Sequence, residues 1–108
     1  MGAARRLRKK ADFERLLKSG ARRKLEGYTF YLAPRERGEA RLGMMVSRRH
    51  ARLASDRNAI KRRIREAFRL ECHRLGSVDV LVRPPYGVKP SPEMYRQLVR
   101  LFSRLNQR

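Results

Sequence analysis

The residues with the clearest chemical character lie between positions 56 and 69, in the string DRNAIKRRIREAFR. At about 100° per residue, Ile60, Ile64 and Phe68 fall on one side of a helix, and basic and amide side chains fall on an adjacent side. We call this second side the cationic face: Arg57, Asn58, Lys61, Arg62, Arg65 and Arg69. Like charges one turn apart, about 5.4 Å, destabilise an isolated helix, and phosphates of a partner would remove that penalty. The pattern predicts a nucleic-acid-binding helix; a merely solvated basic face is the alternative.

The overall charge points in the same direction. Lys and Arg number 29 against 10 Asp and Glu, a formal net charge of +19. The basic residues are spread from Arg5 to Arg108, so the charge belongs to the body of the protein and not to one tail. Such a surplus repels itself in the folded state, which favours a polyanionic partner. Nucleic acid is the first candidate, and an anionic membrane surface is its rival.

Candidate catalytic groups are few and scattered. A protein-centred nuclease needs a general base, an acid, or carboxylates that hold a metal. The possible groups are His50, His73, Cys72 and ten dispersed acids. Cys72 and His73 are neighbours, so their side chains point about 100° apart on a helix. The sequence predicts no catalytic residue and no metal site on this chain, with both histidines at the surface or its boundary.

The elements that would position these groups can be read along the chain. With 108 residues, 41% of them apolar, we expect one domain over 1–108 and a basic, mobile N-terminal arm over 1–11. Helix and strand patterns alternate in the order α-β-β-β-α-β-α, a small α+β sandwich. The expected elements are a helix capped by Asp12 and stopped at Gly20, a brief strand at 21–25, strands at 28–32 and 41–46, a helix from Ser55 or Asp56 to Leu75, a strand at 78–82, and a helix opening at Ser91-Pro92.

The string RNAIKRRIREAFR resembles the signature helix of the bacterial ribonuclease P protein family. The family's pattern is Arg-Asn, two residues, Lys-Arg, two residues, Arg-Glu, and it is met here by Arg57-Asn58, Lys61-Arg62 and Arg65-Glu66. Other family features follow in the same order: Phe13, Gly20, the aromatic strand at 28–32, RLGMMVSRR at 41–49 and DVLV at 79–82. The turn at 50–56 departs from the family, since it is longer and has no glycine, and Leu17 stands where an aromatic is frequent.

The resemblance implies both a fold and a function. The fold would contain a left-handed β-α-β crossover, against a rule that favours the right hand in about 98% of cases. The function would be that of a ribonuclease P subunit, which binds the catalytic RNA and the 5′ leader of precursor tRNA and assists endonucleolytic removal of the leader. The Mg²⁺ would be bound mainly by the RNA, which would make the cut, with none bound by the protein alone. We expect a cytoplasmic chain with no membrane contact and no obligatory protein partner.

The family's leader cleft, between the first helix and the sheet, would draw its stacking surfaces from Phe13 and Tyr31. Base stacking on aromatic rings tolerates varied sequence, as a leader requires. Side chains alternate along a strand, so Tyr28 and Phe30 would face the core and Tyr31 the cleft. Phe13 fits the core equally well. Arg48 would reach a phosphate or be solvated.

Three other classes of protein share some of these features. A structural ribosomal protein would have the same size and charge, without the ordered motifs. A helix-turn-helix protein needs a helix directly before its recognition helix, where this chain has the strand at 41–46. A membrane-surface peptide would need bulky apolar residues opposite its charges and no strands. A single cysteine agrees with a reducing cytoplasm. No apolar run approaches the roughly 18 residues of a membrane span.

Overall fold

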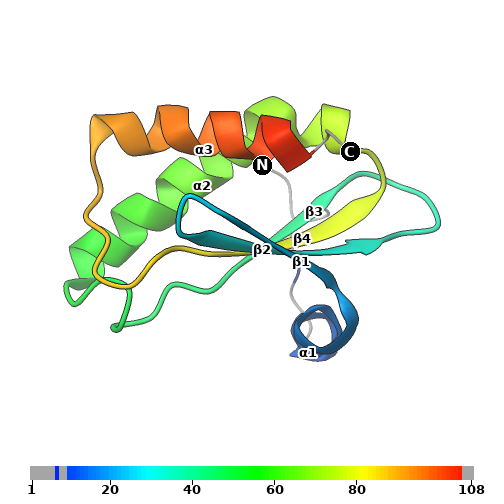
Figure 1. Ribbon diagram of the computed structural model, residues 1–108, viewed down its shortest axis with the longest axis horizontal. Helices are drawn as coiled ribbons and strands as arrows, with labels where there is room; N and C mark the ends of the chain where they lie inside the picture. Colours follow the sequence, from blue (N-terminus) through cyan, green and yellow to red (C-terminus); the bar gives the residue numbers. More distant parts are fainter. Residues whose placement is uncertain (1–6, 8–9, 106–108) are drawn as a thin grey trace.

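A four-stranded sheet separates two helical layers of the computed structural model, which describes Leu7 and residues 10–105 (Figure 1). Helices α2 and α3 cover one face of the sheet, and α1 lies on the other. The elements are α1 Lys10–Ser19, β1 Ala21–Leu25, β2 Tyr28–Pro34, β3 Arg41–Met44, α2 Ala54–Leu75, β4 Val78–Arg83 and α3 Pro92–Leu105. The predicted α+β class and the predicted order of elements are confirmed.

The strands lie in the order β1-β2-β4-β3. The pairs β1/β2 and β2/β4 are antiparallel, whereas β3 and β4 are parallel, with Leu42 opposite Val80. A parallel pair needs a long connection, and α2 supplies it as a β3-α2-β4 crossover. Strand β4 is central, which explains its nearly continuous apolar sequence VDVLVR.

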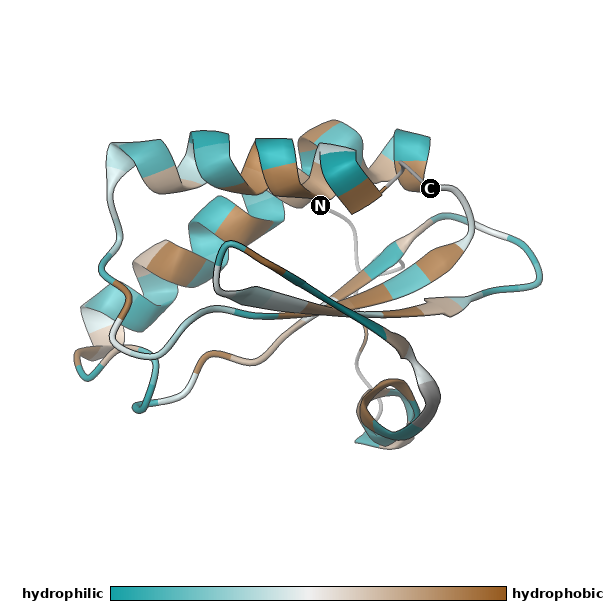
Figure 2. Ribbon diagram, viewed as in Figure 1, coloured by the Kyte–Doolittle hydropathy of each residue, from teal (hydrophilic) through white to brown (hydrophobic). Residues whose placement is uncertain are grey.

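The main core lies between the sheet and the helices α2 and α3. Phe102 meets Phe30 and Phe68 edge to face, at ring-centroid distances of 5.6 and 5.8 Å. Tyr28 and Phe30 are buried in this core, as their alternation predicts. In Figure 2 the central strands are largely apolar, whereas the helices carry both polar and apolar residues, as expected for a core between the sheet and the helices.

A smaller core lies between α1 and the opposite face of the sheet. Its buried members are Leu7, Leu16, Tyr31, Ala33 and Leu81, with Phe13 and Met45 packed against them. The backbone N–H of Leu7 also donates to the Leu42 carbonyl at 2.9 Å, at the outer edge of β3. A Cβ on Gly43 would lie 3.0 Å from both Leu7 Cδ1 and Phe13 Cε1. Glycine therefore lets these two side chains approach the strand closely.

A buried carboxylate also ties α1 to the sheet. Asp79 of β4 is fully buried and accepts two hydrogen bonds of 2.8 Å from Arg41 of β3. Arg15 of α1 donates to the same carboxylate at 2.7 Å, and Arg35 lies 3.7 Å from it. Three guanidinium groups thus compensate one buried charge, which is the condition for a stable buried carboxylate.

Some predicted boundaries are wrong. Helix α1 begins at Lys10, so Asp12 lies in its first turn and does not cap it. Helix α2 begins at Ala54 after Leu53, which forms no side-chain cap, and β3 ends at Met44. The predicted arm at 1–11 lies mostly outside the described residues; within it, Leu7 is buried and residues 10–11 are helical. No helix in the described part of the chain is long and apolar enough to span a bilayer.

Candidate nucleic-acid interface

Helix α2 separates its apolar and cationic residues as its sequence predicts. Ile60, Ile64 and Phe68 are fully buried against the sheet and α3. On the cationic face, Asn58, Arg62 and Arg69 are exposed, and Arg57, Lys61 and Arg65 are half-buried. A half-buried lysine or arginine keeps its charged head in water while its stem covers apolar surface. The amphipathic helix is confirmed, and its basic side chains can reach a partner.

Arg57 has an additional task in this structure. Its Nη1 donates to the carbonyls of Ala51 and Arg52, at 3.0 and 2.9 Å. These bonds fix the turn before α2, the part of the chain that departs most from the family pattern. Arg57 thus positions the turn as well as belonging to the cationic face.

A cleft of about 240 Å³ brings an aromatic residue predicted for the leader cleft together with part of the cationic face. It is lined by Leu7, Phe13, Leu42, Gly43, Met44, Lys61 and Arg65. Phe13 comes from α1 and Lys61 and Arg65 from the cationic face of α2, so an aromatic ring and two cations share one hollow. The sequence did not indicate Leu7 or Gly43 as lining residues. A glycine inside the strand pattern RLGMMV is the signal that marks such a close approach.

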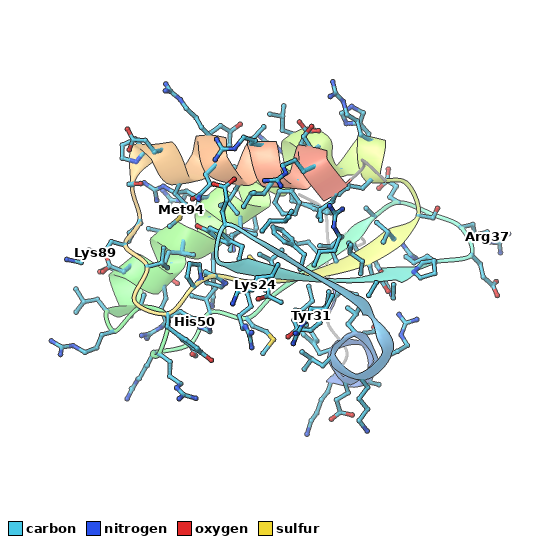
Figure 3. The ribbon with its side chains drawn as sticks, viewed as in Figure 1. Lys24, Tyr31, Arg37, His50, Lys89 and Met94 are labelled. Atoms are coloured by element: carbon cyan, nitrogen blue, oxygen red, sulfur yellow. The ribbon has the colours of Figure 1, made fainter. Side chains whose placement is uncertain are left out.

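Tyr31 occupies a different position from Phe13. Its side chain points toward α1, as the alternation predicts (Figure 3), but only 7% of its surface is exposed. It belongs to the smaller core beneath the cleft and does not line the cleft itself. In this structure Tyr31 supports α1, and Phe13 is the aromatic residue that the cleft exposes.

The turn before α2 contains a buried histidine, where the sequence predicted a surface or boundary one. His50 is 4% exposed, and its Nδ1 accepts a hydrogen bond from the Ser47 backbone N–H at 2.9 Å. Tyr86 stacks on its ring at a centroid distance of 4.9 Å. Burial, and then the charges of Arg83 and Arg49, lower the pKa of His50. The prediction for His50 is therefore wrong, whereas His73 is exposed as predicted.

Arg48 is exposed and borders a second hollow, beside the N-terminus of α2. Among the described residues, no three His, Cys, Asp or Glu side chains lie together in a way that could hold a metal ion. The buried Asp79 is held by arginines, and Glu26 accepts hydrogen bonds from Gln97 and Arg100.

Comparison with known proteins identifies the family. The family model described as Ribonuclease P matches residues 1–106. The chain belongs to the bacterial ribonuclease P protein family. It is 32% identical to the ribonuclease P protein component of Acinetobacter baylyi, over 94% of this chain and 80% of that protein. With that of Pseudoalteromonas translucida it shares 29% identity over 99% of this chain and 78% of the relative.

Solved structures of the family have the same fold. The RNase P protein of Staphylococcus aureus has a TM-score of 0.72 and 28% identity, over 94% of this chain and 91% of that chain. The protein of Thermotoga maritima has a TM-score of 0.66 and 26% identity, over 94% and 88%. Family membership makes this chain a component of an RNA-processing endoribonuclease and partner of its RNA, and it decides against a ribosomal or helix-turn-helix protein.

Proposed function

We propose that this chain binds the catalytic RNA of ribonuclease P through the cationic face of α2 and holds the 5′ leader of precursor tRNA in the cleft beside Phe13. The observation that carries the proposal is the shared cleft, where Phe13 of α1 meets Lys61 and Arg65 of α2. A single strand needs ring faces for its bases and cations for its phosphates, and this cleft offers both. Arg48, Asn58, Arg62 and Arg69 are exposed and available to the RNA.

The RNA and its bound Mg²⁺ make the cut that matures the tRNA 5′ end. The protein contributes affinity and position: it neutralises phosphates of the two RNAs and orders the leader near the cleavage site. No protein partner is required, and the reaction takes place in the cytoplasm.

Cleavage of precursor tRNA tests this proposal. The RNA subunit alone, the protein alone and the two together would be compared over a range of Mg²⁺ concentrations. We expect 5′ processing at lower Mg²⁺ when the protein is added, and none from the protein alone. Site-specific cleavage by the RNA-free protein, or an RNA activity that the protein leaves unchanged, would contradict the proposal.

Binding of the 5′ leader beside Phe13 is tested separately, by comparing Phe13→Ala with the parent protein. Phe13→Ala should weaken holoenzyme binding of a precursor with a long leader by roughly 5- to 150-fold, the usual range for one stacked base. A precursor with a one-nucleotide leader serves as the control and should bind equally well to both proteins. A loss of the same size for both precursors would place the leader elsewhere.

A further inference from the structure

Tyr86 is an exposed aromatic residue in the loop between β4 and α3. It is 60% exposed, although the ring lies flat against the buried His50, with an interplanar angle of 13°. The Arg49 guanidinium carbon lies 5.4 Å from its ring centroid. The other tyrosines are buried or half-buried. A large ring held in place while facing solvent is characteristic of binding surfaces.

The support beneath Tyr86 is rigid. His50 is fixed by the hydrogen bond from the Ser47 backbone N–H. The Gly87 backbone N–H donates to the Arg49 carbonyl at 3.4 Å, which joins the loop of Tyr86 to the turn before α2. Pro84 and Pro85 precede Tyr86 and restrict the loop further. The ring thus loses little conformational entropy when a ligand covers it.

Positive charge surrounds a hollow that shares residues with the support of this ring. The hollow, of about 340 Å³, lies beside the first turn of α2 and is lined by His50, which stacks on Tyr86, and by Gly87, the residue after it. Four of its lining residues are cations: Arg48, Arg49, Arg52 and Lys89. Asp56 is the single acid among the described lining residues. His50 and Lys89 lie at the end of the molecule where α2 begins, and Arg37 marks the opposite end (Figure 3). The hollow is separate from the cleft lined by Phe13.

We propose that Tyr86 is a stacking platform for one unpaired nucleotide of an RNA, whose phosphate lies in the hollow among Arg48, Arg52 and Lys89. The inference rests on the proposed function, because it takes the partner to be RNA. A base can cover the exposed part of an aromatic ring without sequence preference, and cations along the same binding surface bind its phosphate. The nucleotide comes from the catalytic RNA or from the precursor tRNA, and binding to each RNA separately distinguishes these sources.

The test compares three substitutions at one position. Tyr86→Phe keeps an aromatic ring, Tyr86→Leu covers His50 without offering a ring, and Tyr86→Ala removes both. At fixed salt, Tyr86→Leu and Tyr86→Ala should weaken RNA binding by roughly 5- to 150-fold, whereas Tyr86→Phe should bind like the parent. The salt slope should stay unchanged in all three, since no charge is removed. Thermal melts identify any variant whose loss is due to unfolding.

Two binding measurements, one with the RNA subunit alone and one with the holoenzyme and precursor tRNA, assign the source of the nucleotide. A loss with the RNA subunit alone assigns it to the catalytic RNA, and a loss only in binding of precursor tRNA by the holoenzyme assigns it to the substrate. Unchanged affinity of Tyr86→Leu in both measurements would overturn the platform. Arg62→Ala separates this failure from that of the proposed function. If Arg62→Ala weakens binding and Tyr86→Leu does not, only the platform fails; if neither does, the proposed RNA contact of α2 fails as well.

Discussion

Arg41 and Asp79 stand directly opposite each other on the parallel strands β3 and β4, and the guanidinium donates to both carboxylate oxygens at 2.8 Å. The same carboxylate accepts from Arg15, so the pair connects the sheet to the helix that carries Phe13. The hydrogen bond from Arg41 to Asp79 also raises the pKa of the arginine. One buried charge therefore helps the smaller apolar core to hold α1 beside the cleft.

Asp79→Asn should destabilise the protein by about 2–3 kcal/mol. Removing one partner of a buried ion pair commonly costs about 3–5 kcal/mol, and the value here is lower because the arginines are partly solvated. Urea denaturation measures the loss, and hydrogen exchange should show α1 opening before the rest of the chain. Glu26→Gln removes an exposed acid that also contacts arginines, and it should have a much smaller effect. Equal losses in the two variants would mean that Asp79 has no special role.

RNA affinity should fall steeply with salt. For about five phosphate contacts by the cationic face, the slope of log K against log salt should be roughly −3 to −5. Lys61→Ala should reduce the magnitude of the slope by about one, since one phosphate contact is lost. Binding titrations at several salt concentrations give both slopes. A slope near zero would show that phosphates contribute little to binding.

The position of a cation should matter more than its charge. Arg62→Ala and Arg65→Ala should weaken RNA binding and leave the fold intact, because neither side chain belongs to the buried stripe of α2. Arg96 is exposed on α3 and is a matched control. Arg104, also exposed on α3, is a less suitable control, because its Nη1 lies 3.4 Å from Glu26 Oε2.

RNA affinity at fixed salt and a thermal melt would be measured for each variant. A purely electrostatic surface would give the same loss at Arg96 as at Arg62, because counterion release counts charges and not positions. Ile64→Ala serves as the opposite control, since Ile64 is fully buried and a cavity there should cost about 2–5 kcal/mol of stability.

Periodicity made much of this structure predictable. The spacing of Ile60, Ile64 and Phe68 predicts which side of α2 is buried, and the alternation of Tyr28, Phe30 and Tyr31 predicts which faces of β2 they occupy. Both predictions are confirmed, because each depends only on local geometry. The roles of the individual cationic residues in RNA binding stay predictions.

Contacts between distant segments were not predictable in the same way. The burial of Tyr31 depends on Leu7 and α1, and that of His50 depends on Tyr86 in a different loop. Asp79 could be assigned to a strand, but its arginine partners come from separate segments. Only tertiary structure brings such residues together, so a reading of local patterns does not find them.

Tyr28→Phe should leave the protein as stable as the parent, or more stable by up to about 1–2 kcal/mol. The Tyr28 hydroxyl is buried and has no hydrogen-bond partner among the described residues, so the fold bears the cost of desolvating it. Burial, and then the charge of Glu26, raises the pKa of Tyr28 to about 12. Urea denaturation of the two proteins at neutral pH tests the expectation. A clear loss of stability in the variant would show that the hydroxyl has a favourable partner.

As the pH falls below about 6.5, we expect His50 to make stability pH-dependent. Its pKa is lowered in the folded state, first by burial and then by Arg83 and Arg49, whereas an unfolded histidine titrates near pH 6.5. In the interval between the two pKa values the unfolded chain binds more protons. The contribution of neutral His50 is therefore complete above about pH 6.5 and is lost as the pH falls toward the folded pKa.

His50→Leu fills the same buried site beneath Tyr86 with a side chain that cannot take up a proton. The free energy of unfolding of the parent should fall with decreasing pH more steeply than that of the variant, by at most about 1.4 kcal/mol per pH unit. Carboxylates such as Glu26 titrate in both proteins, so the difference between the two curves isolates the histidine. Urea denaturation at half-unit pH steps provides the curves. Parallel curves for the two proteins would mean that His50 accepts its proton as readily in the folded chain as in the unfolded one.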